Sequence, residues 1–334
     1  MKPVDDDRVI LSFPRLAGEP ARLLTCYDQP LVEAAHKPLV DLVIVNYRSY
    51  EELTRCLASL ERSHRKLGRI TVVDHDSNSS AAAGISARFP WVELLQRAGN
   101  EGFATGVNRG VACGGGEYLL LLNPDCVADG EAIDRLLAFA AQRRDVGVIG
   151  PRILNPDGTV QGSARRFPGW TTFIAGRSSW LTRRFPGNPL SRWNLPALDE
   201  TTAPIEVDWV SGACMLIRRD AFEWVHGMDE QFFLYWEDAD LCRRLGQNGW
   251  RTMYLPTATI EHAGGRSSIH AYRESLAAFH ASAFTLFRKH GGRSWQWLAP
   301  VVYVALRLRL RLLLYLNRHR LTSTAVVPNH FTHA

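Results

Sequence analysis

The feature that most constrains the fold of this chain is a regular alternation of short apolar runs and helical patterns between residues 39 and 150. The apolar runs are rich in Val, Ile and Leu, which is typical of strands buried on both faces of a sheet. Between the first two runs, Tyr50–Leu60 places apolar residues at helical spacing. This alternation predicts an α/β fold with a mainly parallel, Rossmann-like sheet flanked by helices. The expected strands are Leu39–Asn46, Arg69–Asp74, Trp91–Leu95, Tyr118–Leu122 and Val146–Ile149.

Polar residues follow three of these strands at the point where each strand ends. They are Asn46–Arg48, Asp74–Asp76 and Asn123–Asp125. A single polar strand end is commonly a turn, and Asn-Pro-Asp suits that role. In open α/β sheets, however, ligands bind beyond the carboxyl ends of the strands. Three polar ends on one edge therefore predict a ligand site there.

A second candidate site is the carboxylate-rich segment that contains Glu237, Asp238 and Asp240. The segment reads as a helix start, where backbone N–H groups and the helix dipole favour negative charge. The apolar run Gln231–Trp236 leads into it, so at least one carboxylate should be partly desolvated and more basic, as a general base requires. The alternative is a solvated helix start with acidic capping residues.

The segment Gly99–Gly110 is rich in glycine and should let the backbone approach a ligand before a helix begins. It does not match the dinucleotide fingerprint, and the chain has no phosphate loop of the GxxxxGK[ST] type. Beyond residue 150, Val160–Phe167 and Val207–Ile217 read as strands, the second interrupted by Ser211–Ala213. Between them, Pro168–Pro204 predicts a long irregular connection.

The cysteines and the N-terminus point to a cytoplasmic protein. Six cysteines are scattered without a CxxC pair, which indicates reduced thiols and no zinc site. The first eight residues are polar and acidic, without the apolar core of a secretory signal.

The positive charge of this chain, formally +5, resides in its C-terminal part. Eight Lys or Arg residues and no acidic residue follow Glu274.

In the tail, Arg307, Arg309 and Arg311 interrupt the apolar run that starts at Trp295, and the run is too short before them for a spanning helix. Aromatic and arginine residues together favour attachment at a membrane surface. A basic helix packed on the protein body is the alternative. Nucleic-acid binding is not indicated, because no reading motif accompanies the charge.

The ordered set of motifs resembles the family 2 inverting glycosyltransferases with the GT-A fold, most closely their bacterial rhamnosyltransferase-like branch. The resemblance runs from about Asp41 to Ser268 and implies a glycosyltransferase domain over 39–270. An N-terminal extension over 1–38 would precede this domain, and a helical tail over 271–334 would follow it. The motifs are Val43–Tyr47, Val72–Ser77, Gly99–Phe103 with Asn108, Leu122–Asp125, Ser211–Ala213, Glu237–Leu241 and His262.

The resemblance also implies roles for individual residues. Asp238 matches the general base, and Asp125 with His262 would hold a divalent metal, Mg²⁺ or Mn²⁺, which assists departure of a nucleoside diphosphate. Asn123 stands where the family's DxD motif has its first Asp. Trp209 would either contact the acceptor or pack in the core. The nucleotide-sugar-binding residues would be Asn46, Asp74, Asp76, Asn108, Asn123 and Asp125. The acceptor-binding residues would be Glu237, Asp240, Trp209 and Gly212, with an orienting role as the alternative for Glu237 and Asp240.

The expected activity is transfer of a deoxyhexose such as L-rhamnose from a dTDP- or UDP-sugar to a lipid-linked or polysaccharide acceptor, in cell-surface glycan synthesis. The enzyme would lie at the inner face of the cell membrane as a peripheral protein. One alternative is a sugar-nucleotide pyrophosphorylase, although Asn46–Ser49 lacks the glycines that such an enzyme would carry after its first strand. Another is a non-catalytic, membrane-attached sugar-binding protein.

Overall fold

The structure is a computed structural model that describes residues 40–76, 79–169, 184–185, 188–195, 202–264 and 272–317. The described residues all belong to one compact unit, His36–Ala334. The expected N-terminal extension and most of the expected irregular connection lie outside the described residues.

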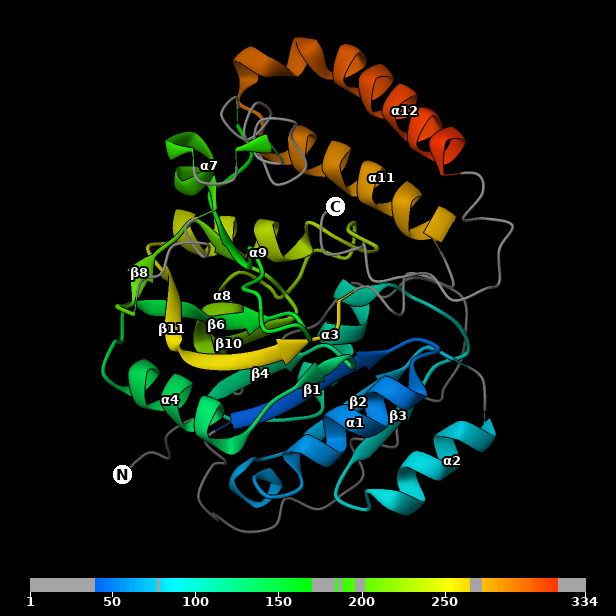
Figure 1. Cartoon of the computed structure of the whole chain (residues 1–334), viewed down its shortest axis with the longest axis vertical. Helices are drawn as coiled ribbons and strands as arrows, with labels where there is room; N and C mark the ends of the chain where they lie inside the picture. Colours follow the sequence, from blue (N-terminus) through cyan, green and yellow to red (C-terminus); the bar gives the residue numbers. More distant parts are fainter. Residues whose placement is uncertain are drawn as a thin grey trace, which may run out of the picture. The chain divides into compact units, whose positions relative to one another are not determined.

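A nine-stranded mixed sheet forms the centre of this unit (Figure 1), in the order β3-β2-β1-β4-β10-β6-β11-β5, with β8 paired to β11. Neighbours within β3-β2-β1-β4 are parallel, as are β6 and β11. The strands are β1 (Val40–Asn46), β2 (Ile70–Asp74), β3 (Glu93–Gln96), β4 (Tyr118–Leu122), β5 (Cys126–Val127), β6 (Val146–Leu154), β8 (Ile205–Glu206), β10 (Cys214–Arg218) and β11 (Arg251–His262).

Strand β10 departs from the parallel pattern because it runs antiparallel to both of its neighbours, β4 and β6. Its first residue, Cys214, pairs with Leu122 at the carboxyl end of β4. The chain therefore enters β10 at the edge where the polar strand ends lie. Just before this point, β9 (Trp209–Val210) pairs with β7 (Ala164–Arg165) in a separate two-stranded sheet. The Ser211–Ala213 interruption thus separates two strands of different sheets.

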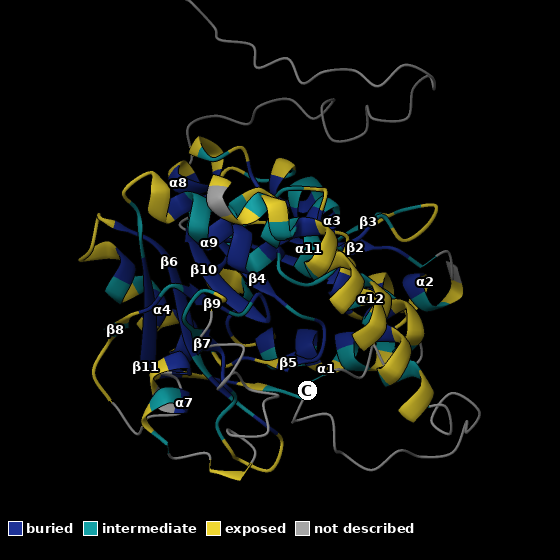
Figure 2. Ribbon diagram, turned by 90° about the horizontal axis from the view of Figure 1, so that it is seen from above, coloured by how far each residue is buried: buried dark blue, intermediate teal, exposed yellow. Residues whose placement is uncertain are grey.

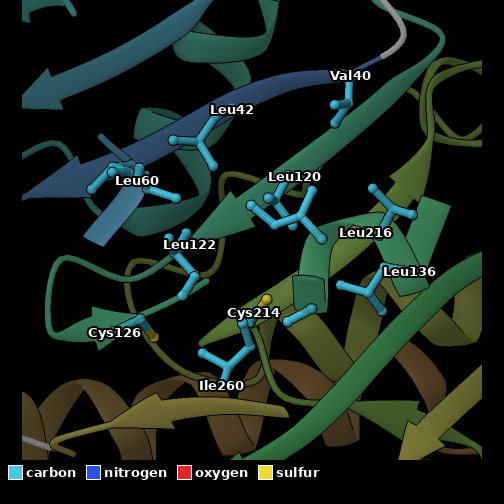
Figure 3. Close-up of a cluster of buried hydrophobic side chains, with 14 of the residues drawn as sticks. Val40, Leu42, Leu60, Leu120, Leu122, Cys126, Leu136, Cys214, Leu216 and Ile260 are labelled. Atoms are coloured by element: carbon cyan, nitrogen blue, oxygen red, sulfur yellow. The ribbon is translucent and has the colours of Figure 1, made fainter. Parts of the chain in front are cut away.

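Helices cover both faces of the sheet, and alternate residues of β1 point into two different cores. Leu42 (Figure 3) and Ile44 lie in the first core, which also receives side chains from α1, α2 and α4. Val43 and Val45 lie in the second, with α3, α8 and α9. This explains the apolar run Leu42–Val45 of β1. The helices are α1 (Tyr50–Leu60), α2 (Ser79–Arg88), α3 (Phe103–Ala112), α4 (Gly130–Ala141), α7 (Pro189–Asn194), α8 (Arg219–Trp224), α9 (Glu237–Gln247), α11 (Tyr272–His290) and α12 (Ala299–Leu316).

The expected helical tail is present as the pair α11 and α12, linked by a 3₁₀ turn at Arg293–Leu298. The two helices pack through Phe284 against Tyr303 and through a hydrogen bond between Arg309 and His280. Much of α12 is exposed (Figure 2). Within the described part of the chain, no helix combines the length and apolarity needed to cross a bilayer.

Candidate active site

The carboxyl ends of β1 and β2 bring Asn46 and Asp74 together, as expected. The two residues are register partners, and Asn46 Nδ2 donates a hydrogen bond to Asp74 Oδ1 at 2.9 Å. Tyr50, in the first turn of α1, donates its hydroxyl to Asp74 Oδ2 at 2.7 Å. Burial and this hydrogen bond raise the pKa of the Tyr50 hydroxyl. Asn46 Oδ1 is buried and has no hydrogen-bond partner among the described residues, so it can still accept one from a ligand.

Asp76 lies at the same edge, next to Arg48. Its Oδ1 atom is 3.9 Å from Arg48 Nε, and its backbone N–H points to Asp74 Oδ1 at 3.4 Å. Three of the expected nucleotide-binding residues, Asn46, Asp74 and Asp76, therefore share one end of the sheet. Tyr50 belongs to this group by contact, although in the sequence it is simply the first residue of a helix.

Asn108, in contrast, faces a different segment. Its Nδ2 atom donates to Met228 O and Glu230 Oε1, each at 2.9 Å, and its Oδ1 atom accepts from Met228 N at 2.9 Å. The side chain thus fixes the 228–230 loop to α3. A nucleotide could engage Asn108 only by displacing these bonds.

The glycine-rich segment also packs on the protein itself. Gly102, directly before α3, has φ +90°, and a Cβ atom there would lie 2.6 Å from Phe233 O. Phe103 N donates to the same carbonyl at 2.8 Å. Glycine at position 102 therefore lets the backbone lie close to Phe233, in the segment that leads into α9. This contact is within the protein, so Gly102 does not support the expected contact with a ligand.

Asp125 and His262 meet at the end of the sheet, as the resemblance implied. Asp125 follows β4, and His262 ends β11, where it is the register partner of Cys126. His262 Nε2 lies 3.1 Å from Asp125 Oδ1. The possible ligand atoms of Asp125, Cys126 and His262 all lie within 4.8 Å of one another. Burial and the Asp125 charge raise the pKa of the Cys126 thiol, which donates to Ala213 O. Cys126 is therefore a poor ligand for a hard cation.

Gln161 orients the His262 ring. Its Nε2 atom donates to Asn155 Oδ1 at 2.8 Å and to His262 O at 2.9 Å, which leaves Gln161 Oε1 facing His262 Nδ1 at 3.1 Å. Nδ1 must then carry a hydrogen, so Nε2 of a neutral ring presents a lone pair. That lone pair faces Asp125 Oδ1, which is also an acceptor. Either a proton or a metal cation has to lie between them, so these residues fit a divalent ion.

Asn123 contributes through its backbone. Its N–H donates to Ala213 O at 2.9 Å, and its carbonyl accepts from Cys126 N at 3.1 Å. The end of β4 is thereby tied to the Ser211–Ala213 loop.

The carboxylates Glu237 and Asp238 begin α9. Asp238 Oδ2 accepts from Gly212 N at 2.9 Å, and its Oδ1 atom accepts from Ala239 N at 2.8 Å. Burial raises the pKa of Asp238, opposed by these two hydrogen bonds and by the charge of Arg165. Burial and the charge of Asp238 raise the pKa of Glu237 well above its usual range. Both side chains are more basic than ordinary carboxylates, as the apolar approach to the helix predicted.

Trp209 lies in the core, the second of its two expected roles. Its side chain is buried, and its ring centroid lies 6.0 Å from that of Trp236. The guanidinium carbon of Arg165 lies 4.7 Å from the Trp209 ring centroid, and Trp209 Nε1 donates to Arg166 O. Arg165 therefore connects the Trp209 ring with the Asp238 charge. The sequence offers no sign of this, because Arg165 belongs to a two-residue strand.

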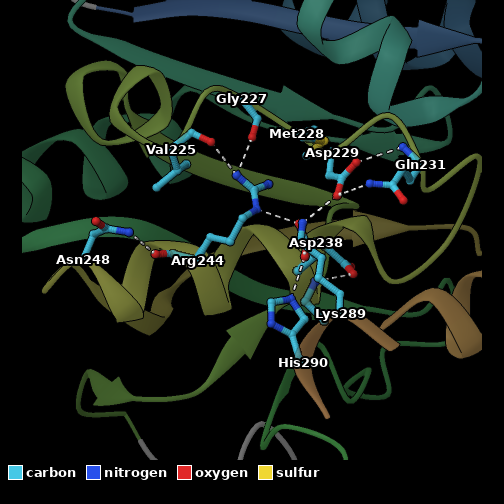
Figure 4. A network of polar contacts seen from close by, with 12 residues as sticks. Val225, Gly227, Met228, Asp229, Gln231, Asp238, Arg244, Asn248, Lys289 and His290 are labelled. Carbon is cyan, nitrogen blue, oxygen red and sulfur yellow. Dashed lines mark hydrogen bonds and ion pairs between the residues drawn. The ribbon is translucent and has the colours of Figure 1, made fainter. Parts of the chain in front are cut away.

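Asp240 is completely buried. Its side chain pairs with Arg244, Lys289 and His290, which Figure 4 shows converging on the start of α9. Its Oδ2 atom lies 2.7 Å from Arg244 Nε, and its Oδ1 atom lies 2.8 Å from Lys289 Nζ and 2.6 Å from His290 Nε2. These partners hold the pKa of Asp240 at about 2, against the opposing effect of burial. Direct contact with an acceptor, which the resemblance implied for Asp240, would require a cation to leave.

Comparisons with known proteins identify the family of this chain. The profile of the family described as "Glycosyltransferase like family 2" matches residues 37–279. An N-acetylglucosaminyl-diphospho-decaprenol L-rhamnosyltransferase of Mycobacterium tuberculosis is 34% identical over 277 residues, which cover 79% of this chain and 88% of that protein. The rhamnosyltransferase WbbL of Escherichia coli is 27% identical over 147 residues, 44% of this chain and 52% of that protein.

Among solved structures, a GalNAc transferase with UDP, GalNAc and Mn²⁺ superimposes with a TM-score of 0.52 at 15% identity, over 87% of this chain and 58% of that chain. At this identity the likeness concerns the fold alone, and it confirms the expected GT-A type. The family profile spans most of the chain, and the mycobacterial relative matches most of both proteins. The chain therefore belongs to glycosyltransferase family 2.

Proposed function

We propose that this glycosyltransferase transfers L-rhamnose or a related deoxyhexose from a dTDP- or UDP-sugar to a lipid-linked acceptor, with inversion at the anomeric carbon. The names of the mycobacterial and E. coli relatives support rhamnosyl transfer, and the mycobacterial name supports a polyprenyl-diphosphate acceptor. A polysaccharide acceptor is the second candidate, because another relative is named an O-antigen biosynthesis protein.

The observation that carries this proposal is the Ser211–Ala213 loop, which joins the two halves of the site. On one side, Gly212 N donates to the Asp238 carboxylate at 2.9 Å. On the other side, Ala213 O accepts from Asn123 N at 2.9 Å, two residues before Asp125. Asp238 and the Asp125–His262 pair, which would bind the cation, thus flank one short backbone segment, and this supports a single displacement between acceptor and donor.

In this mechanism Asp238 accepts the proton of the acceptor hydroxyl as that hydroxyl attacks the sugar. Inversion in one displacement needs only one base, and the raised pKa of Asp238 favours proton transfer. Asn46 and Asp74 would bind the nucleotide at the strand ends. Asp125 and His262 would hold a divalent ion, Mg²⁺ or Mn²⁺, which neutralises the leaving diphosphate when bound. Gln161 keeps the His262 ring in the ligating orientation.

We further propose that residues 39–270 carry out the chemistry and that the tail attaches the enzyme to the cytoplasmic face of the membrane. On α12 and the turn before it, exposed apolar side chains recur at intervals of three or four residues, which places them along one helix face. Arg307 and Arg311 are also exposed and would favour anionic lipid. The residues along the face are Trp297, Val301, Val304, Leu308, Leu312 and Tyr315.

The test is an assay of the purified chain with a panel of dTDP- and UDP-sugars, a polyprenyl-diphospho-sugar acceptor and Mg²⁺ or Mn²⁺. We expect nucleoside diphosphate release that depends on the acceptor and is fastest with dTDP-L-rhamnose, and a product of inverted configuration by NMR. Formation of nucleoside triphosphate and sugar 1-phosphate from the nucleotide-sugar and added inorganic diphosphate would indicate a pyrophosphorylase instead. Binding of donors without turnover would indicate a non-catalytic protein.

A further inference from the structure

Helix α11 contacts the segment that carries Asp238 at two points, one on each side of that residue. Upstream, Ser282 Oγ donates to Leu234 O at 2.9 Å, and the Phe279 ring lies 5.3 Å from that of Trp236. Downstream, Lys289 and His290 pair with Asp240. Asp238 lies between these two anchors although it contacts neither of them.

The segment between the anchors has an unfavourable backbone conformation. Tyr235 and Trp236 have φ +67° and +70°, in the left-handed region that non-glycine residues adopt at a cost in free energy. Trp236 is also the N-cap of α9, yet no side chain caps the helix there. The start of α9, and hence the direction of Asp238, is therefore set by contacts from outside the helix.

Charge balance at the start of α9 depends on α11 as well. Glu237, Asp238 and Asp240 put three carboxylates into the first turn, and Glu237 Oε2 is buried without a hydrogen-bond partner among the described residues. Arg244 pairs with Asp240 from within α9 and also donates to Val225 O and Gly227 O. The remaining two partners of Asp240 come from the C-terminal end of α11. Without them, a fully buried carboxylate would rely on Arg244.

We propose that α11 positions the general base: its two anchors, at Leu234–Trp236 and at Asp240, hold the first turn of α9 so that Asp238 faces Gly212. Asp240 and His290 are then positioning residues, and the C-terminal helices serve catalysis as well as attachment. This inference rests on the proposed role of Asp238 as the base.

The first test compares Asp240→Asn with Asp41→Asn in the full-length chain. Asp41 is the matched control, because it is also a buried carboxylate paired with arginine, at 2.8 Å from Arg219, but it lies at the start of β1, away from the strand ends of the site. Both variants should lose stability. Only Asp240→Asn should lower kcat on a water-soluble acceptor analogue, by about 10- to 100-fold, the scale for a displaced catalytic group, with the donor KM within about twofold.

The second test asks whether a hydrogen-bond donor at position 290 is sufficient. His290→Leu should lower kcat as Asp240→Asn does, whereas His290→Gln, which keeps an N–H group, should restore most of it. Ser282→Ala is a smaller change that removes the hydrogen bond of the upstream anchor and leaves the Phe279–Trp236 contact. It should also reduce kcat while the donor KM is unchanged. It therefore tests the proposal even where the position 290 variants fold poorly.

Equal kcat losses in Asp240→Asn and Asp41→Asn, at equal folded fractions, would overturn the positioning role. Full activity of both His290→Leu and Ser282→Ala would do the same. These results differ from a failure of the proposed function, which would appear as turnover by Asp238→Asn itself.

Discussion

At the residue scale, Asp238 combines two opposing influences on its carboxylate. Burial makes the side chain more basic, while the N–H groups of Gly212 and Ala239 stabilise its ionised form and fix its direction. A base in water would be free to turn. Here both oxygens have partners in the backbone, so the carboxylate is oriented before an acceptor arrives.

We predict that Asp238→Asn abolishes transfer and leaves donor binding close to that of the wild type. The change removes the proton acceptor but little of the nucleotide site, and loss of a general base typically costs roughly 10²–10⁴-fold in rate. Turnover numbers and calorimetric titration with the nucleotide-sugar measure the two effects. A variant that keeps more than about a tenth of wild-type turnover would rule out this role on the same scale.

Asp125→Ala should weaken donor binding only when a divalent metal is present, because the diphosphate then loses the ion that links it to the protein. Calorimetry with and without Mg²⁺ or Mn²⁺ is the measurement. Gln161→Leu provides a graded comparison: it leaves both ligands in place and should lower metal affinity by about 10- to 100-fold, as loss of a ligand-orienting partner does. Identical donor affinities in Asp125→Ala and wild type would exclude the metal role.

At the scale of elements, the contact between α9 and α11 should govern stability in acid. The folded pKa of Asp240 is about 2, below its ordinary value of 3.8, so the folded state keeps this carboxylate ionised where the unfolded chain protonates it. The resulting stabilisation is fully present above about pH 4 and is lost as the pH falls through about 2.

We therefore expect Asp240→Asn to lower the free energy of unfolding at neutral pH by about 3 kcal/mol, as breaking a buried pair does. The loss of stability between pH 4 and pH 2 should be shallower in the variant. Urea unfolding over that pH range measures both effects. An unchanged pH dependence would show that other carboxylates are responsible.

The elements also show what sequence can and cannot predict here. Tyr50–Leu60 and Tyr118–Leu122 were predicted with the observed bounds, because their apolar spacing is a local signal. Asn46 and Asp74 were predicted together, because parallel strands bring their carboxyl ends to one edge. The reversed direction of β10, the Gln161 contact with His262 and the His290 contact with Asp240 were not, because each joins segments far apart in the chain and leaves no local pattern.

At the scale of the whole molecule, the tail helices connect the proposed site to a lipid surface. Removing residues from Trp295 onward deletes the exposed face of α12 and keeps the α11 anchors. The truncated chain should move from the membrane pellet to the supernatant and lose activity on a lipid-linked acceptor more than on a soluble analogue. High salt should partly release the intact protein, since arginine supplies part of the attraction. Intact protein that stays in the supernatant with anionic vesicles at low salt would leave α12 as a packed element of the fold.

The antiparallel insertion of β10 has a consequence for how the chain is made. Until Cys214–Arg218 has left the ribosome, the apolar strand β4 lacks its neighbour on one side, and β6 cannot join the growing sheet through β10. At ordinary translation speeds this unpaired edge persists for roughly 5–20 s, long enough to attract other chains or a chaperone. A nascent chain arrested after Gly150 should therefore be protease-sensitive and aggregate, whereas one arrested after β11 should resist both. A stable, monomeric fragment ending at Gly150 would show instead that the first half of the sheet folds without waiting for β10.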